Sequence, residues 1–274
     1  MDFPQSASGR SAAEVAREAA TLAREITLPR YRDVGRGNAV EKTSKGRGNY
    51  VTETDLACER AVLALIRHEF PEHQVLSEEA AQDVDGWSSG WLWVVDPLDG
   101  TSNFSRGIPT FAFNIALCLD GEPVLGITLN PVTGDEFFAT KGGGLWVNGS
   151  PARISAAPTL AESLLGMGLG YDYDRAKKML DLLAGLWPNV QMVQNIGSAA
   201  LGLAYAASGR FDVYLHHLLF PWDMAPGILF VREAGGLFLS RDGGPVTIYS
   251  EGVIAGAPGP VNELARLVAA TPWR

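Results

Sequence analysis

Helical spacing of apolar residues marks two segments near the N-terminus. Ser11-Ala12-Ala13-Glu14 has the residues of a capping box, in which a serine and a later glutamate each bond the other's backbone. Apolar residues then recur on one helical face, so we predict a helix that ends before Gly35. A second helix is predicted from about residue 54 to residue 70, with a buried face formed by Leu56, Leu63, Ile66 and Phe70.

From residue 91 to about residue 155 the pattern is mostly that of β-strands. The apolar run 91–95 predicts a buried strand. Segments 111–119 and 124–129 predict a hairpin across the turn Asp120-Gly121-Glu122. Two more strands are expected, at 136–140 and 145–147, on either side of a run of glycines.

After residue 160, predicted strands and helices alternate, which is typical of an α/β arrangement. The chain of 274 residues therefore divides into an α+β half, residues 1–155, and an α/β half, residues 156–274, within one compact unit. We expect strands at 163–168, 190–193, 211–215, 237–239 and 253–255, and helices at 174–186, 198–207, 223–233 and 261–270.

Glycines and basic residues dominate the segment 35–49, which lies between the two N-terminal helices. The composition predicts a mobile basic loop. This loop is either a solvated linker or, if a phosphate site lies beside it, a lid over that site. Its basic residues are Arg36, Lys42, Lys45 and Arg47.

Two carboxylates follow the predicted strand 91–95, in the sequence Asp96-Pro97-Leu98-Asp99-Gly100-Thr101. Pro97 fixes its backbone φ and Asp99-Gly100 is a turn dipeptide, so both acids are held where the strand ends. Carboxylates this close repel each other unless a cation lies between them, and hard cations such as Mg2+ prefer oxygen ligands. Thr101 could open a helix whose free N–H groups hold an anion, which predicts a phosphate site beside the metal ligands.

Two further acidic segments complete the candidate site. The segment 75–79 predicts a short strand that ends in Glu78-Glu79, and Trp222-Asp223 precedes an apolar helix that continues to Glu233. Asp223 is expected to be the N-cap of that helix, because an aspartate there accepts bonds from free backbone N–H groups. A site built from oxygen ligands alone suits a hard cation.

Charge and cysteine content narrow the class of protein. The chain has 31 acidic and 22 basic residues, a net charge of -9, whereas a general nucleic-acid-binding protein carries a basic surface. Cys58 and Cys118 are the only cysteines, and we expect buried, reduced thiols rather than a disulfide or a zinc site. The absence of an apolar signal core and of any apolar run of spanning length predicts a cytoplasmic location and no membrane partner.

In their order and spacing, these segments resemble the inositol monophosphatase family, part of a superfamily of Mg2+-dependent, Li+-sensitive phosphatases. The likeness runs from about residue 45 to the C-terminus. Several short motifs in a consistent order are more specific than any one of them. The matching stretches are Val51-Thr52-Glu53-Thr54-Asp55, Glu78-Glu79, Asp96 to Thr101 with Phe104 after it, Lys141-Gly142-Gly143-Gly144 through Asn148-Gly149, Gly197-Ser198-Ala199, and Trp222-Asp223-Met224-Ala225 followed by Gly227.

The resemblance implies a layered α/β/α/β/α sandwich of the inositol monophosphatase and fructose bisphosphatase type, commonly a homodimer. It also implies two or three Mg2+ ions per subunit. One ion would take Glu78, Asp96 and the Leu98 carbonyl. A second would take Asp96, Asp99 and Asp223, so that Asp96 bridges both ions.

The same resemblance implies roles in catalysis and substrate binding. Glu78 and Thr101 would orient the attacking water, and Asp55 would lie beside the two ions or on a weaker third one. The remaining substrate contacts implied by the family are the backbone N–H groups of Gly100, Thr101 and Ser102 around the phosphate, and the loop residues Ser198 and Ala199.

The likeness is interrupted at His216. Seven residues before Asp223 the family has an acid that contacts inositol hydroxyls, whereas this chain has a histidine. An imidazole cannot accept two sugar hydroxyls as a carboxylate does. The resemblance therefore implies phosphatase chemistry but not inositol specificity, and His216 either faces the substrate or is a structural residue of a strand.

Two classes of function are consistent with the sequence. The first is a Mg2+-dependent phosphatase acting on a small phosphorylated metabolite: an inositol phosphate or sugar-like analogue, histidinol phosphate, or a nucleotide. The second is a regulatory binding protein that acts through protein or RNA-polymerase contacts. The complete set of ligand acids favours the enzyme, and the acidic charge disfavours direct nucleic-acid contact.

Overall fold

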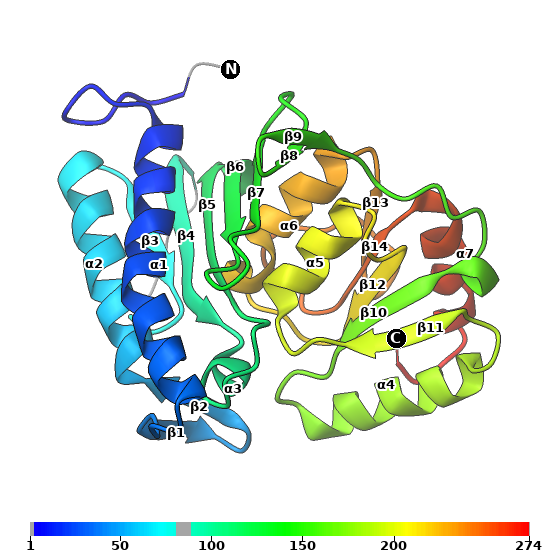
Figure 1. The fold of residues 1–274 in the computed structure, drawn as a ribbon. Coiled ribbons are helices and arrows are strands. Elements are labelled where there is room, and N and C mark those ends of the chain that lie inside the picture. Colours follow the sequence, from blue (N-terminus) through cyan, green and yellow to red (C-terminus); the bar gives the residue numbers. More distant parts are fainter. Residues whose placement is uncertain (1–2, 81–88, 274) are drawn as a thin grey trace.

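The computed structural model describes residues 3–80 and 89–273. Two large β-sheets lie on either side of a pair of helices, and a two-stranded hairpin forms a third, small sheet (Figure 1). The first sheet has seven strands in chain order, all antiparallel to their neighbours except β3 with β4. Its strands are β3 (Gln74–Ser77), β4 (Trp91–Asp99), β5 (Ala112–Leu119), β6 (Glu122–Leu129), β7 (Glu136–Thr140), β8 (Leu145–Val147) and β9 (Ser150–Ala152).

The second sheet has five strands in the order β11-β10-β12-β14-β13. Because β10 is parallel to β12, their carboxyl ends lie side by side, with Gly168 opposite His216. The strands are β10 (Leu164–Gly168), β11 (Met192–Asn195), β12 (Val213–His216), β13 (Leu237–Ser240) and β14 (Val253–Gly256).

Helices cover both sheets and also lie between them. Their bounds are α1 (Ala12–Gly35), α2 (Glu53–Glu69), α3 (Thr101–Phe104), α4 (Tyr173–Leu186), α5 (Ala199–Ala207), α6 (Pro221–Glu233) and α7 (Pro258–Val268), with a 3-10 turn at Leu160–Glu162.

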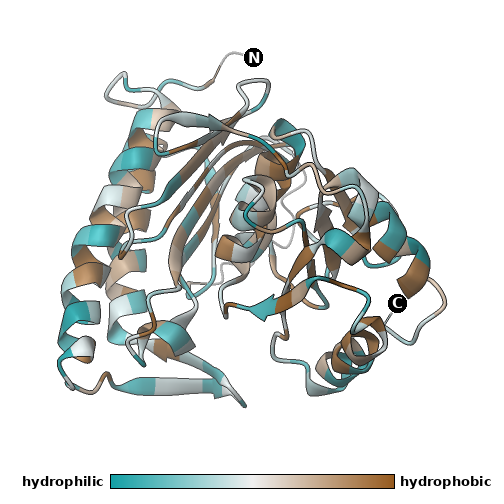
Figure 2. Ribbon diagram, turned by 45° about the vertical axis from the view of Figure 1, so that its right-hand side comes forward, coloured by the Kyte–Doolittle hydropathy of each residue, from teal (hydrophilic) through white to brown (hydrophobic). Residues whose placement is uncertain are grey.

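The layers follow from the alternation of side chains along each strand. On β4, Trp93 and Val95 pack against α1 and α2, whereas Val94 packs with the residues of α5 and α6. On the second sheet, Leu165 and Val213 pack with α4 and α7, and Tyr214 with α5. Figure 2 shows the apolar character of the strands of the first sheet. The five layers confirm the α/β/α/β/α sandwich expected for this chain.

The helix starts agree with the capping patterns. Ser11 caps α1, and its side chain and that of Glu14 each bond the other's backbone, as the capping box predicts. Ser198 is the N-cap of α5. Its side chain accepts one hydrogen bond, from the Leu201 N–H at 3.2 Å.

The segment 35–49 is not wholly a loop, which corrects the expectation from its composition. Two antiparallel strands, β1 (Lys42–Gly46) and β2 (Asn49–Thr52), form a hairpin between α1 and α2. Its tip contacts the other half of the molecule. The Tyr173 hydroxyl donates to the Arg47 carbonyl at 3.2 Å, and the Arg47 guanidinium lies 4.2 Å from the Tyr173 ring centroid. Gly46 ends the first strand of the hairpin and Gly48 lies in its turn, whereas Gly35 ends α1 and Gly37 lies in the turn that follows it.

Cys58 and Cys118 are buried and free, as expected. Burial raises the pKa of both thiols. Within residues 3–80 and 89–273, no helix combines the length and the apolar character needed to cross a membrane.

Gly202→Ala is expected to destabilise the fold by about 1–3 kcal/mol, the usual cost of overpacking a core. An added Cβ would lie 2.2 Å from a ring carbon of the buried Tyr214, where α5 meets β12. Gly185→Ala in α4 is the matched control, because its Cβ would meet no atom within 4 Å. Alanine is favoured there by roughly 0.5–1 kcal/mol. Urea unfolding measures the free energy of unfolding of both variants and of wild type. A Gly202→Ala protein as stable as wild type would contradict the close packing of α5 against Tyr214.

Candidate active site

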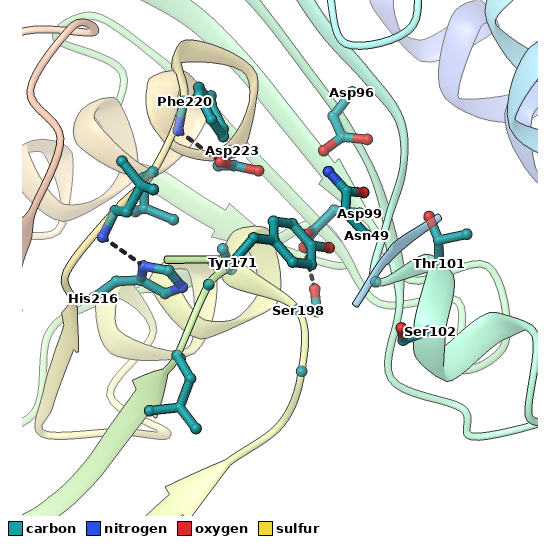
Figure 3. Close-up of a pocket in the computed structure, with 18 of the residues that line it drawn as sticks. Asn49, Asp96, Asp99, Thr101, Ser102, Tyr171, Ser198, His216, Phe220 and Asp223 are labelled. Atoms are coloured by element: carbon teal, nitrogen blue, oxygen red, sulfur yellow. Dashed lines mark hydrogen bonds between the residues drawn. The ribbon is translucent and has the colours of Figure 1, made fainter. Parts of the chain in front are cut away.

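A cavity of about 440 Å³ opens between the two halves, at the carboxyl ends of β4, β10 and β12 (Figure 3). The turn after β4 forms one wall. The loop after β10 and the start of α6 form the other. Most of the residues proposed from the sequence line it: Glu78, Asp96, Leu98, Asp99, Gly100, Thr101, Ser102, Ser198, Ala199, His216 and Asp223.

Asp96 and Asp99 are placed by a bulge in the pairing of β4 with β5. Asp96 pairs with Asn114 and Asp99 with Ala112, so β4 has one extra residue in this interval. Pro97 lies in the bulge, where its missing N–H removes no regular ladder bond. The bulge therefore turns two carboxylates toward one cavity from a strand that would otherwise alternate its side chains.

The turn that follows requires glycine at position 100. Gly100 has a φ of 95°, and an added Cβ would lie 3.1 Å from the Gly197 carbonyl oxygen and 3.2 Å from the Phe111 Cβ. This close approach brings the predicted phosphate-binding turn, from Gly100 to Ser102, against the loop before α5.

Asp223 is not the N-cap of its helix, contrary to the expectation. Helix α6 begins two residues earlier, at Pro221, and Phe220 is the N-cap. Proline is favoured at the first helical position, because it has no N–H to leave unpaired. The Asp223 carboxylate instead accepts the Phe220 N–H at 2.7 Å. Asn114 of β5 fixes the same turn, donating from Nδ2 to the carbonyls of Trp222 (2.7 Å) and Asp223 (3.2 Å).

The three aspartates converge, with one oxygen from each lying within 4.8 Å of the others. Burial raises the pKa of Asp96 well above its ordinary value, and the charges of Glu78, Asp99 and Asp223 raise it further. Burial followed by the charge of Asp99 likewise raises the pKa of Asp223. A cluster of carboxylate oxygens that repel one another is the donor set preferred by a hard divalent cation, so these residues fit Mg2+.

Glu78 borders the same cavity but lies outside this group of three in the described part of the chain. Its carboxylate binds Lys45 of the β1–β2 hairpin, whose Nζ lies 2.9 Å from Oε1 of Glu78 and of Glu79. Burial raises the pKa of Glu78, and Lys45 opposes this shift. Segment 35–49 was interpreted either as a solvated linker or as a lid over a phosphate site. The contact of Lys45 with Glu78 and Glu79 agrees with the lid.

Thr101 is bound to Asp55. Its hydroxyl lies 2.9 Å from Asp55 Oδ1 and 3.2 Å from the Leu98 carbonyl oxygen, and it can donate its one hydrogen to either. Asp55 also accepts the Thr52 N–H at 3.0 Å, so it closes the capping box of α2. Burial raises the pKa of Asp55 to about 6, against the opposing hydrogen bonds from Thr52 and Thr101.

Ser198, predicted as a substrate contact, binds a predicted metal ligand. Its hydroxyl and the Ala200 N–H, the latter at 2.9 Å, both donate to Asp99 Oδ2. Burial raises the pKa of Asp99, and these hydrogen bonds oppose the rise. The start of α5 therefore positions Asp99 across the boundary between the two sheets. Ala199 remains in the cavity wall.

His216 ends β12 and lines the cavity on the side away from Asp96 (Figure 3). Its Nδ1 accepts the Leu218 N–H at 3.2 Å, so the proton of the neutral ring is on Nε2. Burial, and secondly the neighbouring His217, lower the pKa of His216 to about 3. The imidazole is therefore uncharged near neutral pH, and it cannot repel a cationic substrate by its own charge.

Two positioning residues were not identified from the sequence. Glu59 of α2 accepts the Ser77 hydroxyl and the N–H groups of Glu79 (3.0 Å) and Ala80 (2.9 Å), which holds the loop that carries Glu78. Asn114 anchors α6, as described above. Both residues could have been found as polar residues within an apolar pattern. Glu59 lies on the buried face of a helix, and Asn114 lies in a buried strand.

The fold and this acidic cavity agree with the family comparison. A model of the inositol monophosphatase family matches residues 10–272. This chain belongs to the inositol monophosphatase family.

Individual relatives carry two kinds of name. "Nus factor SuhB" of Pseudomonas aeruginosa is 35% identical over 230 residues, covering 82% of this chain and 85% of the relative. "Inositol monophosphatase" of Dictyostelium discoideum is 34% identical over 234 residues, covering 83% and 85%. The crystal structure of extragenic suppressor protein suhB from Bartonella henselae matches with a TM-score of 0.87 and 33% identity, over 94% of this chain and 98% of that one.

In the absence of metal, Asp96→Asn is expected to be more stable than wild type, increasingly so as the pH rises above 3.8. A carboxyl whose pKa is raised in the folded state stabilises the fold below its unfolded pKa. That stability is lost as the pH rises through the folded pKa. The stability advantage of Asp96→Asn over wild type should therefore grow across this pH range. Urea unfolding of both proteins in EDTA, from pH 4 to pH 8, measures it, and a difference independent of pH would contradict the repulsion.

Adding Mg2+ is expected to reverse this order. A ligand that binds only the folded state at 100 times its Kd stabilises by about 2.7 kcal/mol, and the variants lack part of its site. Wild type should therefore gain more in Tm than Asp96→Asn or Asp99→Asn. Equal shifts in all three proteins would mean that these acids do not share a metal site.

Proposed function

We propose that this protein is a Mg2+-dependent phosphatase that hydrolyses a small phosphate monoester. The observation that carries the proposal is the convergence of Asp96, Asp99 and Asp223 within one cavity, beside the turn from Gly100 to Ser102. Family membership supports the same reading. A homodimer with two or three Mg2+ ions per subunit belongs to the proposal through the family resemblance. A cytoplasmic location belongs to it because the sequence has no apolar run of membrane-spanning length.

The three aspartates, with Glu78 and the Leu98 carbonyl, are the residues that would hold the ions. When bound, such cations neutralise phosphate oxygens and lower the pKa of water. The chain itself orients the reactants. If Thr101 gives its only hydrogen to Asp55, the Thr101 oxygen is left as an acceptor for a water hydrogen. Glu78 borders the same space and offers a second acceptor. The N–H groups of the turn at Gly100 to Ser102 would hold the phosphate.

A regulatory binding role is the second candidate, favoured by the relatives named Nus factor SuhB. Those names describe the relatives. A regulatory contact made by the protein surface would not need the cluster of acids that this chain has. The two candidates differ in their dependence on that cluster. Asp96→Asn should strongly reduce phosphatase activity, but it should leave a binding role that uses another surface intact.

Phosphatase activity is expected to require Mg2+ and to disappear on chelation. The ligands are carboxylates, which select hard cations. Phosphate release from an aryl phosphate, measured with Mg2+ and then with excess EDTA, tests the requirement. Full turnover by protein whose metal content is confirmed near zero would exclude the proposed mechanism.

Asp96→Asn is expected to lower kcat/KM by roughly a hundredfold or more, about 2.7 kcal/mol, and Asp55→Asn by far less. Asp96 is the proposed bridge between two ions, whereas Asp55 acts by holding Thr101. The comparison uses both purified variants, with folding checked by circular dichroism. Equal losses, or a larger loss in Asp55→Asn, would show that the bridging role is assigned to the wrong residue.

A further inference from the structure

Helix α6, which carries the candidate metal ligand Asp223, has a proline within its first half. A regular helix bonds each carbonyl to the N–H four residues later. Pro226 has no N–H, so it cannot donate to the carbonyl of Trp222. The Trp222 carbonyl therefore lacks the donor that the helix would otherwise supply, and a backbone carbonyl inside a protein needs a partner from elsewhere in the fold.

Asn114 of β5 supplies this donor. Its Nδ2 lies 2.7 Å from the Trp222 carbonyl oxygen and 3.2 Å from the Asp223 carbonyl oxygen, and an amide nitrogen has two hydrogens to donate. The amide oxygen accepts the Thr128 hydroxyl at 2.5 Å, which orients the nitrogen toward the helix. A buried asparagine of the sheet is thus matched to a proline of the helix that packs on it.

The same asparagine lies beside a second metal ligand. In the first sheet, Asn114 pairs with Asp96 of β4 on one side and with Thr128 of β6 on the other. Side chains of directly paired residues point to the same face of a sheet, and α6 covers this face. Asn114 therefore connects the strand that carries Asp96 to the helical turn that carries Asp223.

The proline ring also allows α6 to lie close to the sheet. A Cβ added at Gly126 of β6 would lie 3.0 Å from the Pro226 Cβ and 3.1 Å from its Cα, so no side chain of β6 separates helix and strand at this point. This contact and the hydrogen bond to the Trp222 carbonyl lie about one helical turn apart. Together they fix the distance of α6 from the sheet and its position along its own axis.

We propose that Asn114 and Pro226 are a coupled positioning pair for the metal site. The proline leaves the Trp222 carbonyl free for the Asn114 amide, and this hydrogen bond sets the position of Asp223 relative to Asp96. Both residues act through Asp223 and need no contact with a cation or a substrate. The inference rests on the proposed Mg2+-dependent function, and it identifies residues that determine the affinity of the site for the cation.

A double-mutant cycle in Mg2+ affinity tests the pair, with binding measured by calorimetry in the absence of substrate. Asn114→Leu keeps the approximate shape of the side chain but removes its donors, so it should weaken Mg2+ binding about tenfold. Pro226→Ala restores an N–H four residues after Trp222 and should change the affinity by no more than about threefold. In the Pro226→Ala protein, Asn114→Leu should also cost no more than about threefold, because the helix then bonds its own carbonyl.

Kinetics provide a readout that a general loss of structure would not change. Asn114→Leu should raise the Mg2+ concentration for half-maximal hydrolysis of an aryl phosphate about tenfold, whereas kcat at saturating Mg2+ should fall by no more than about threefold. Asn130→Ala is the matched control, because Asn130 is also fully buried but its hydrogen bonds go to Pro109, Val132 and Thr133. It should lower the urea midpoint and leave the Mg2+ affinity unchanged.

An equal loss of Mg2+ affinity from Asn114→Leu in both backgrounds, or no loss in the wild-type background, would overturn the pairing. If Asn114→Leu does not fold, Thr128→Val removes only the hydroxyl that orients the amide. Thr128→Val should weaken Mg2+ binding in the same direction, and persistence of this effect in the Pro226→Ala protein would also overturn the pairing.

Failure of the proposed function gives a different result. In that case no ester is hydrolysed, but Mg2+ still binds and the calorimetric cycle still decides whether Asn114 and Pro226 are coupled. A wild-type protein that binds no Mg2+ would overturn the metal site and the positioning pair together.

Discussion

Mutual repulsion among buried carboxylates determines how this site is built. Asp96 and Asp99 come from one sheet and Asp223 from a helix packed between the sheets, and their oxygens lie within 4.8 Å of one another. Such an arrangement destabilises a folded chain unless the acids are protonated or a cation is bound. The surrounding structure opposes the repulsion with fixed donors. The Leu98 N–H binds Asp96, the start of α5 binds Asp99, and the Phe220 N–H binds Asp223.

The same constraint explains the position of Lys45. In the described structure its ammonium group is the cation that lines the acidic cavity, and it bonds both Glu78 and Glu79. The hairpin that carries Lys45 is held at its tip by Tyr173, a residue of the second half. One short segment therefore supplies positive charge to the acids and also connects the two halves across the site. Entry of a divalent cation at Glu78 would compete with this ammonium group for the same oxygens.

Much of the fold and of the acid set could be predicted from the sequence, because the signals are local. Helical and strand periodicity located the elements, and the turn from Asp96 to Thr101 carries its carboxylates within a few residues. The errors and omissions concern tertiary contacts and the exact ends of elements. Proline at position 221 moved the start of α6 and made Asp223 the third helical residue. The links from Ser198 to Asp99 and from Asn114 to α6 join residues about a hundred positions apart, which no local pattern reveals. The glycines of residues 35–49 did not distinguish a loop from a hairpin, because a loop and the turn of a hairpin have similar compositions.

Diffraction from metal-containing crystals would show whether the three aspartates bind divalent cations. Crystals grown with Mn2+, which takes the same oxygen ligands and scatters anomalously, would show where the ions lie. We expect an anomalous peak among Asp96, Asp99 and Asp223 and a second peak beside Glu78, with Lys45 moved away from it. The first peak should be lost in Asp96→Asn. Data from metal-saturated crystals with no peak at these carboxylates, and with Lys45 still bound to Glu78, would contradict metal binding by these residues.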